Sequence, residues 1–101
     1  CFLDHNGSQS FGITKKTHPE FYPIKSKIKS FGWNVYEVNG HNVKDIVKSF
    51  RKAVFAKKPT MIICNTTKGK GVSFMENKPI WHYRSPNVDE YKKAIKEINL
   101  S

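Results

Sequence analysis

The first residues that could carry chemistry form the polar run 4–7, with the sequence Asp-His-Asn-Gly, directly after a short apolar segment. Carboxylate and amide oxygens suit a hard divalent cation such as Mg²⁺, which prefers oxygen ligands. A simpler interpretation is an Asx turn, in which the Asn6 side chain accepts a hydrogen bond from a backbone N–H further along the chain. Both interpretations predict a turn at the end of a strand.

A second candidate is the run 66–71, Thr-Thr-Lys-Gly-Lys-Gly, which follows the apolar segment 61–64. Its hydroxyls, lysines and glycines suit a loop whose backbone a bulky ligand approaches closely. The run lacks the G-x-x-x-x-G-K spacing of a Walker loop. A mobile glycine turn with solvated lysines is the alternative interpretation.

Two histidines are further candidates. His82, next to Trp81, could bind a phosphate or hydroxyl group and change its protonation near neutral pH, but a structural histidine is the more common case. His41 lies in a Gly-His-Asn turn and is expected to do no more than support the start of a helix. The sequence shows neither a Cys/His metal cluster nor a credible cysteine nucleophile pair, which excludes zinc and thiol chemistry.

The elements that must position these residues alternate between strand-like and helix-like apolar spacing. Helical crossovers predict parallel strands whose carboxyl ends share one edge of the sheet, where ligand-binding loops leave. The fold class is therefore α/β, and we expect Asn6 and His82 to approach the same cleft. The predicted strands are 1–4, 33–38 and 60–65. The predicted helices are 22–31, 43–57 and a last one after Asn87. Residues 6–12 are expected to form a loop, and residues 72–86 an ordered segment without regular secondary structure.

The helix ends and inner faces can also be predicted. Asn42 and Asn87 are suited to cap the second and third helices, and Pro23 suits the first turn of the first helix. Residues at helical spacing are expected to form the buried faces. They are Ile24, Ile28 and Phe31 in the first helix and Tyr91, Ala94, Ile95 and Ile98 in the last.

Composition limits the protein class. The chain has 101 residues, enough for one core, and its net charge of +10 favours anionic partners, although the lysines are dispersed. The two cysteines, Cys1 and Cys64, lie far apart in the sequence and favour a reduced, cytoplasmic protein. No apolar run is long enough for a membrane span, and the first residues do not show the pattern expected of a signal sequence. The abrupt apolar start predicts that the chain begins in the middle of a fold.

The order of several motifs resembles transketolases, most closely the separate amino-terminal subunit of the split form. The resemblance covers nearly the whole chain and implies that residues 1–101 are the C-terminal portion of a diphosphate-binding domain. The most specific motif is the run Gly-Lys-Gly-Val-Ser-Phe-Met-Glu-Asn at 69–77. The other matching runs are Asp-His-Asn-Gly at 4–7, Phe-Gly-Trp-Asn-Val at 31–35, Val-Asn-Gly-His-Asn at 38–42, Lys-Pro-Thr at 58–60 and Trp-His at 81–82.

The resemblance implies a doubly wound, mainly parallel α/β sheet, partly complete here, with helices on both faces, that binds thiamine diphosphate through Mg²⁺. Asn6 matches a side-chain ligand of the metal, and Ser8 matches a position whose main-chain carbonyl completes the metal site. Lys68 and Gly69 match a loop beside the thiazolium ring. His82 matches a catalytic histidine near the cofactor diphosphate and the donor substrate.

The implied activity is transfer of a two-carbon ketol unit from a ketose phosphate to an aldose phosphate. The implied partners are the rest of the domain and a pyrimidine-binding domain or subunit, in a dimeric or heterotetrameric assembly, so the fragment alone is expected to be inactive. The sequence departs from the family at Ser8, Phe11 and Tyr83. Three alternatives remain: a deoxyxylulose-phosphate synthase, a sulfosugar transketolase or a non-catalytic basic binding module. Nucleic-acid binding is disfavoured because the sequence shows no known motif for stacking on bases.

Overall fold

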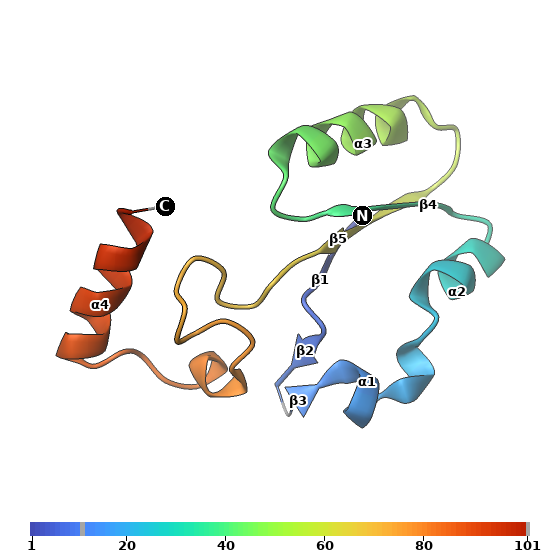
Figure 1. The fold of residues 1–101 in the computed structure, drawn as a ribbon. Helices are drawn as coiled ribbons and strands as arrows, with labels where there is room; N and C mark the ends of the chain where they lie inside the picture. The colour runs from blue at the N-terminus through green and yellow to red at the C-terminus, as the bar shows by residue number, and fades with distance from the viewer. Residues whose placement is uncertain (11, 101) are drawn as a thin grey trace.

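The computed structural model describes residues 1–10 and 12–100, and its elements run from β1 at the N-terminus to α4 near the C-terminus (Figure 1). Five strands, four α-helices and two 3-10 helices lie in this part of the chain. In order they are β1 Phe2–His5, β2 Ser8–Gln9, β3 Gly12–Ile13, α1 Thr14–Thr17, η1 Pro19–Phe21, α2 Ile24–Ser30, β4 Asn34–Asn39, α3 Val43–Phe55, β5 Thr60–Asn65, η2 Pro79–His82 and α4 Val88–Ile98.

The predicted parallel sheet is confirmed. β5 lies in the centre and pairs in parallel with β1 on one side and β4 on the other. The predicted strand 60–65 matches β5, whereas β1 and β4 each begin and end one residue later than predicted. The pairing places His5, Asn39 and Asn65 side by side, so the three strands end together at one edge.

Helices cover both faces of this sheet. Leu3, Val35 and Ile63 lie on one face and pack with Ile24 of α2. Alternate residues of a strand point to opposite faces, and on the other face the ring of Phe2 stacks on Phe50 of α3 at 6.0 Å between centroids. Figure 1 accordingly shows α3 above the sheet and α1 and α2 below it. This is the doubly wound α/β arrangement that the sequence predicts.

Both predicted helix caps are present. The Asn42 side chain accepts hydrogen bonds from the backbone N–H groups of Lys44 and Asp45 at the start of α3. At the start of α4, Asn87 and Glu90 form a reciprocal capping box, which satisfies two backbone N–H groups that the helix leaves without partners. The positions of these two helix starts could therefore be read from single residues.

The prediction that one face of α4 is buried is correct only for Ala94, which is 7% exposed. The helix lies apart from the sheet (Figure 1) and is tied instead to the irregular segment before it, where Glu97 accepts hydrogen bonds from the backbone N–H and the hydroxyl of Ser73. Its other apolar residues have no sheet to pack against. Tyr91, Ile95 and Ile98 are exposed, and so is Phe31 after α2.

The segment predicted as a loop over 6–12 contains a small hairpin instead. Strands β2 and β3 pair antiparallel, with Ser8 opposite Ile13. Gly7, just before β2, and Gly12, at the start of β3, adopt positive φ angles of 68° and 145°, conformations open chiefly to glycine. Pro23 precedes α2 as its N-cap residue, so this helix begins two residues later than the predicted 22–31.

Cys64 lies on the central strand between Asp4 and Val38 of the neighbouring strands, and it is buried as predicted. Burial, with a smaller contribution from the negative charge of Asp4, raises the pKa of the Cys64 thiol. The thiol therefore stays protonated and unreactive at neutral pH. Separately, no helix formed by the described residues is long and apolar enough to cross a membrane.

Candidate functional site

Polar side chains at the carboxyl edge of the sheet are joined in a fixed network. His5 Nδ1 lies 2.7 Å from Asn65 Oδ1, and His5 Nε2 lies 3.0 Å from the Tyr22 hydroxyl. Asn65 Nδ2 donates to Glu37 at 3.0 Å. Because both ring nitrogens of His5 are engaged, this histidine is positioned as a structural link between β1, β5 and the segment before α2.

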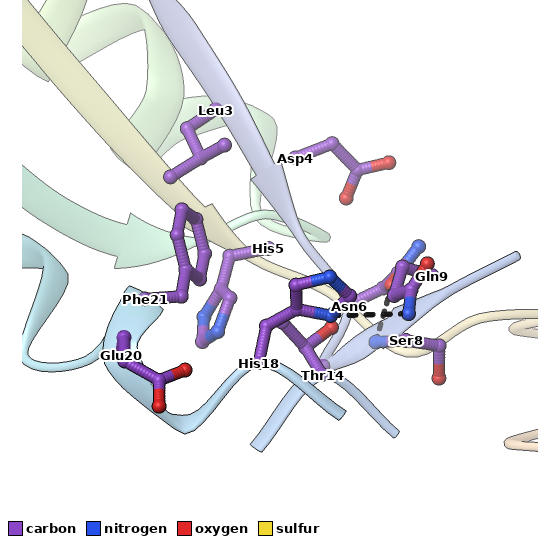
Figure 2. Close-up of a pocket in the computed structure, with 11 residues that line it drawn as sticks. Leu3, Asp4, His5, Asn6, Ser8, Gln9, Thr14, His18, Glu20 and Phe21 are labelled. Carbon is purple, nitrogen blue, oxygen red and sulfur yellow. Dashed lines mark hydrogen bonds between the residues drawn. The ribbon is translucent and has the colours of Figure 1, made fainter. Parts of the chain in front are cut away.

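Asn6 and Ser8 line a pocket of about 550 Å³ that opens beside the end of β1 (Figure 2). Asn6 Oδ1 accepts a hydrogen bond from the Ser8 backbone N–H at 2.9 Å, so the Asx-turn interpretation is confirmed. An amide oxygen has two lone pairs, and this bond uses one of them. The turn is thus compatible with a second role for Asn6 as an oxygen ligand.

The opposite wall of this pocket comes from the hairpin and the short helices after it. Figure 2 shows Gln9, Thr14 and His18 grouped near Asn6, with Phe21 and Glu20 further along the wall. Gln9 Nε2 donates to the Thr17 hydroxyl at 3.0 Å and lies 3.3 Å from His18 Nδ1. These contacts were not predicted, because no sequence pattern indicated that residues 14–21 fold back onto the strand end.

The donor atoms favour oxygen coordination of a hard cation. Over residues 1–10 and 12–100, no three His, Cys, Asp or Glu side chains gather as a metal site of their own would need. The Asp4 carboxylate accepts a hydrogen bond from the Thr66 hydroxyl. The oxygens of Asn6 and Ser8 therefore fit a magnesium ion only if a diphosphate, water and further protein groups complete its octahedral shell.

Lys68 and Gly69 lie on the loop after β5, which is held against residues 75–77. The backbone carbonyl of Lys68 accepts from Asn77 N–H at 2.9 Å. Gly69 has a φ of 75°, and a Cβ atom there would lie 2.6 Å from the carbonyl oxygen of Met75. Glycine is therefore required at this position both by the backbone conformation and by the close approach.

The substitution Gly69→Ala is expected to lower the stability of the protein by about 2–4 kcal/mol, because it adds a steric clash to the cost of a positive φ. Gly71→Ala is the matched control: its φ is 93°, but nothing lies within 4 Å of an added Cβ. Gly71→Ala should lower the stability only by the cost of placing a non-glycine residue at a positive φ, about 1–2 kcal/mol. Urea unfolding of both variants measures the difference, and equal losses would show that the contact with Met75 is unimportant.

His82 lies at the end of η2, and its Nδ1 atom is 3.4 Å from Nζ of Lys68. A lysine ammonium has only donors, so Nδ1 must accept and the ring proton resides on Nε2. The structure thus brings together Lys68, Gly69 and His82. None of these three lines the pocket that contains Asn6 and Ser8, so the expected common cleft stays a prediction.

Arg84 fixes the segment that carries His82, and sequence reasoning missed it. Its guanidinium lies 3.9 Å from the centre of the Trp81 ring and donates two hydrogen bonds to Glu90, at 2.8 and 2.6 Å. Trp81 Nε1 in turn donates to the Phe74 carbonyl at 3.1 Å. The only sequence signal was the capping-box spacing of Asn87 and Glu90.

The Arg84–Glu90 pair is expected to make stability sensitive to acid. The hydrogen bonds from Arg84, followed by the bond from the Asn87 backbone, lower the pKa of Glu90 from 4.5 to about 2. A carboxyl whose pKa is lower in the folded state stabilises the fold above its unfolded pKa, and this contribution is lost as pH falls from about 4.5 to about 2. Thermal unfolding of the wild type and Glu90→Gln should therefore differ at pH 6 and converge near pH 2. A difference that is constant with pH would contradict this assignment.

Phe11, one of the expected family departures, lies outside the described residues. Tyr83, another departure, is exposed, and its ring contacts that of His82 with centroids 5.3 Å apart. The third, Ser8, belongs to the short strand β2 and supplies the backbone N–H that Asn6 binds. Two of the three departures therefore lie beside predicted site residues.

Comparison with known proteins identifies the family. The family model described as "Transketolase, thiamine diphosphate binding domain" matches residues 1–98. The chain is 37% identical over 100 residues to one of the subunits of the apulose-4-phosphate transketolase of Phocaeicola vulgatus, covering 98% of this chain and 35% of that protein. It is 39% identical over 99 residues to the SqwG subunit of the 6-deoxy-6-sulfo-D-fructose transketolase of a Clostridium species, covering 97% and 36%.

A solved structure gives the same answer. The transketolase of Campylobacter jejuni superposes with a TM-score of 0.87 at 26% identity, over 97% of this chain and 15% of that one. In sequence, the chain spans about a third of the length of the two curated relatives described above. Because the family model matches residues 1–98, the chain belongs to the transketolase family, within its thiamine diphosphate binding domain.

Proposed function

We propose that this chain is the C-terminal portion of the diphosphate-binding domain of a transketolase that uses thiamine diphosphate and Mg²⁺. The enzyme transfers a two-carbon ketol unit from a ketose phosphate to an aldose phosphate. The observation that carries the proposal is the family match over residues 1–98, supported by relatives named as transketolase subunits. The remainder of the domain and a pyrimidine-binding domain or subunit complete the site, in a dimeric or heterotetrameric assembly.

The metal and the diphosphate are assigned to the pocket beside β1. Asn6 contributes its side-chain oxygen and Ser8 its main-chain carbonyl, while the volume of about 550 Å³ lies within the usual range for cofactor sites. Thiamine diphosphate, when bound, supplies the carbanion-stabilising chemistry of the transfer. The protein groups orient the cofactor and exclude other reactions.

Lys68, Gly69 and His82 are assigned to the cofactor and the donor sugar. The positive charge of Lys68 suits a phosphate oxygen, and Gly69 supplies the positive φ and the close contact with Met75 that fix the loop. His82 is the catalytic residue of the three. Because Lys68 engages its Nδ1, His82 presents the Nε2–H as a donor toward a phosphate or sugar oxygen.

A sulfosugar or apulose-4-phosphate donor is the second candidate, since relatives at 39% and 37% identity are named for such reactions. The enzyme is placed in the cytoplasm, where free cysteines such as Cys64 stay reduced. Sugar phosphates are the expected substrates, and the +10 charge serves to attract these anions rather than nucleic acid.

The decisive experiment uses the complete, assembled enzyme. Turnover of xylulose 5-phosphate, apulose 4-phosphate and 6-deoxy-6-sulfofructose is measured with and without thiamine diphosphate and Mg²⁺. Activity that requires both supports the proposal, and the preferred donor identifies the reaction. Heparin binding without any cofactor-dependent turnover would favour a basic binding module. The 101-residue chain alone is expected to be inactive and to bind the cofactor weakly, because the two oxygens assigned to it do not fill the octahedral shell of Mg²⁺.

A further inference from the structure

His41 makes a contact that the proposed function does not use. Its Nε2 atom accepts a hydrogen bond from the backbone N–H of Thr67 at 2.7 Å, across 26 positions of sequence. The sequence-based expectation was that His41 supports the start of a helix. That role belongs to Asn42, whose side chain caps α3, so the expectation for His41 is wrong.

The turn that carries His41 is itself firmly placed against the end of β5. Gly40 N–H donates to the Asn65 carbonyl at 2.8 Å, and a Cβ on Gly40 would overlap the side chain of Thr66 and lie 3.0 Å from Cys64 Cβ. Asn39 Oδ1 accepts from the His41 N–H at 2.9 Å. The imidazole is therefore delivered to Thr67 by a rigid turn rather than by a flexible side chain alone.

Thr67 directly precedes Lys68, whose ammonium lies 3.4 Å from His82. From this geometry we propose that His41 is a positioning residue, which holds the start of the 66–71 loop in its cofactor-binding conformation through the Thr67 N–H. Only the neutral imidazole has an acceptor nitrogen. Protonation of His41 therefore releases the loop, and cofactor affinity falls in acid. The inference rests on the proposed function only for the identity of the ligand.

Charged groups of both signs lie around His41. Lys70 lines the same pocket as His41, with the Glu76 carboxylate 3.8 Å from its ammonium. Asp4 accepts from the Thr66 hydroxyl, and Asp45 lies in the first turn of α3. Within residues 1–10 and 12–100, no carboxylate forms an ion pair with His41 itself.

Two variants distinguish the loss of the acceptor atom at position 41 from the protonation of the imidazole. His41→Leu removes the acceptor at every pH, whereas His41→Gln keeps an acceptor oxygen at similar reach that cannot be protonated in this range. Asn42→Ala is the matched control, since it removes a cap from the same turn without touching the Thr67 bond. All are compared in the complete enzyme, by calorimetric binding of thiamine diphosphate with Mg²⁺ between about pH 8 and pH 5.

At pH 8, His41→Leu should raise the Kd for the cofactor by about 2- to 10-fold, the effect of one ordinary hydrogen bond. Between pH 8 and pH 5, the Kd of the wild type should rise by a similar factor more than the Kd of His41→Gln does. The Kd of Asn42→Ala should change with pH as that of the wild type does. A His41→Leu enzyme that binds as the wild type does at pH 8 would overturn the proposal. So would a His41→Gln enzyme with the full pH dependence of the wild type.

A measurement without cofactor keeps the test independent of the proposed function. Hydrogen exchange of the Thr67 amide in the cofactor-free enzyme should be faster in His41→Leu than in the wild type or Asn42→Ala. Faster exchange with no thiamine diphosphate binding in any variant would overturn the proposed function and leave the loop assignment intact. Unchanged exchange at Thr67 would instead overturn the role of His41 while leaving the proposed function standing.

Discussion

In the complete enzyme, Asn6→Ala is expected to raise the Mg²⁺ and thiamine diphosphate concentrations needed for half-maximal activity by about 10- to 100-fold, as is typical when groups around a metal site are lost. The physical reason is that, in the proposed site, Asn6 is one of two metal ligands assigned to this chain. Magnesium demands near-octahedral oxygen coordination, so a lost oxygen is not easily replaced by rearrangement. Titration of activity with each component measures the effect.

The Asx turn provides the competing explanation, because Asn6 Oδ1 also holds the Ser8 N–H at 2.9 Å. If this turn were the only role of Asn6, the substitution would lower stability and leave the cofactor requirement unchanged. Asn42→Ala is a suitable control, since Asn42 also binds backbone N–H groups but lies at the start of α3, away from the pocket. Equal behaviour of the two variants would remove Asn6 from the metal site.

His82→Ala is expected to lower kcat for a phosphorylated donor by about 100-fold, the lower range for loss of a proton donor or an oxyanion-stabilising group. The reason is the loss of the Nε2–H that Lys68 orients by engaging Nδ1. The effect on an unphosphorylated ketose should be smaller, since fewer anionic oxygens are present. Steady-state kinetics with both donors gives kcat and KM separately.

Tyr83→Phe is the matched control for this experiment. It keeps the ring that contacts His82, with centroids 5.3 Å apart, and removes only an exposed hydroxyl. Its kcat should remain within about twofold of the wild type, as expected for a surface change. A His82→Ala enzyme with normal kcat and a raised KM would show that His82 contributes only to binding.

The sheet could be predicted from the sequence because its signals are local. The apolar run 60–65 and the caps Asn42 and Asn87 each depend on a few neighbouring residues, and the structure places all three as expected. The direction of an exposed helix face is not local. Tyr91 and Ile95 have helical spacing, but α4 packs on the segment around Ser73 instead of the sheet, which no periodicity reveals.

The candidate site was predictable only in its loops. Asn6 and Lys68 follow strands that end at one edge, so topology alone placed both loops correctly. The contacts between His41 and Thr67 and between Arg84 and Glu90 depend on where two chain segments meet in space. The separation of 26 residues between His41 and Thr67 matches no sequence period, and therefore this contact became visible only in three dimensions.

The buried thiol of Cys64 can serve as a chemical probe for local opening of the sheet. It lies on the central strand between β1 and β4, and its pKa is raised by burial and by Asp4. Its side chain points out of the sheet, close to the turn at Gly40, so an alkylating reagent can reach it only when the structure around this strand opens. The rate of its modification therefore follows the opening of the structure around the central strand, which thiol labelling can measure.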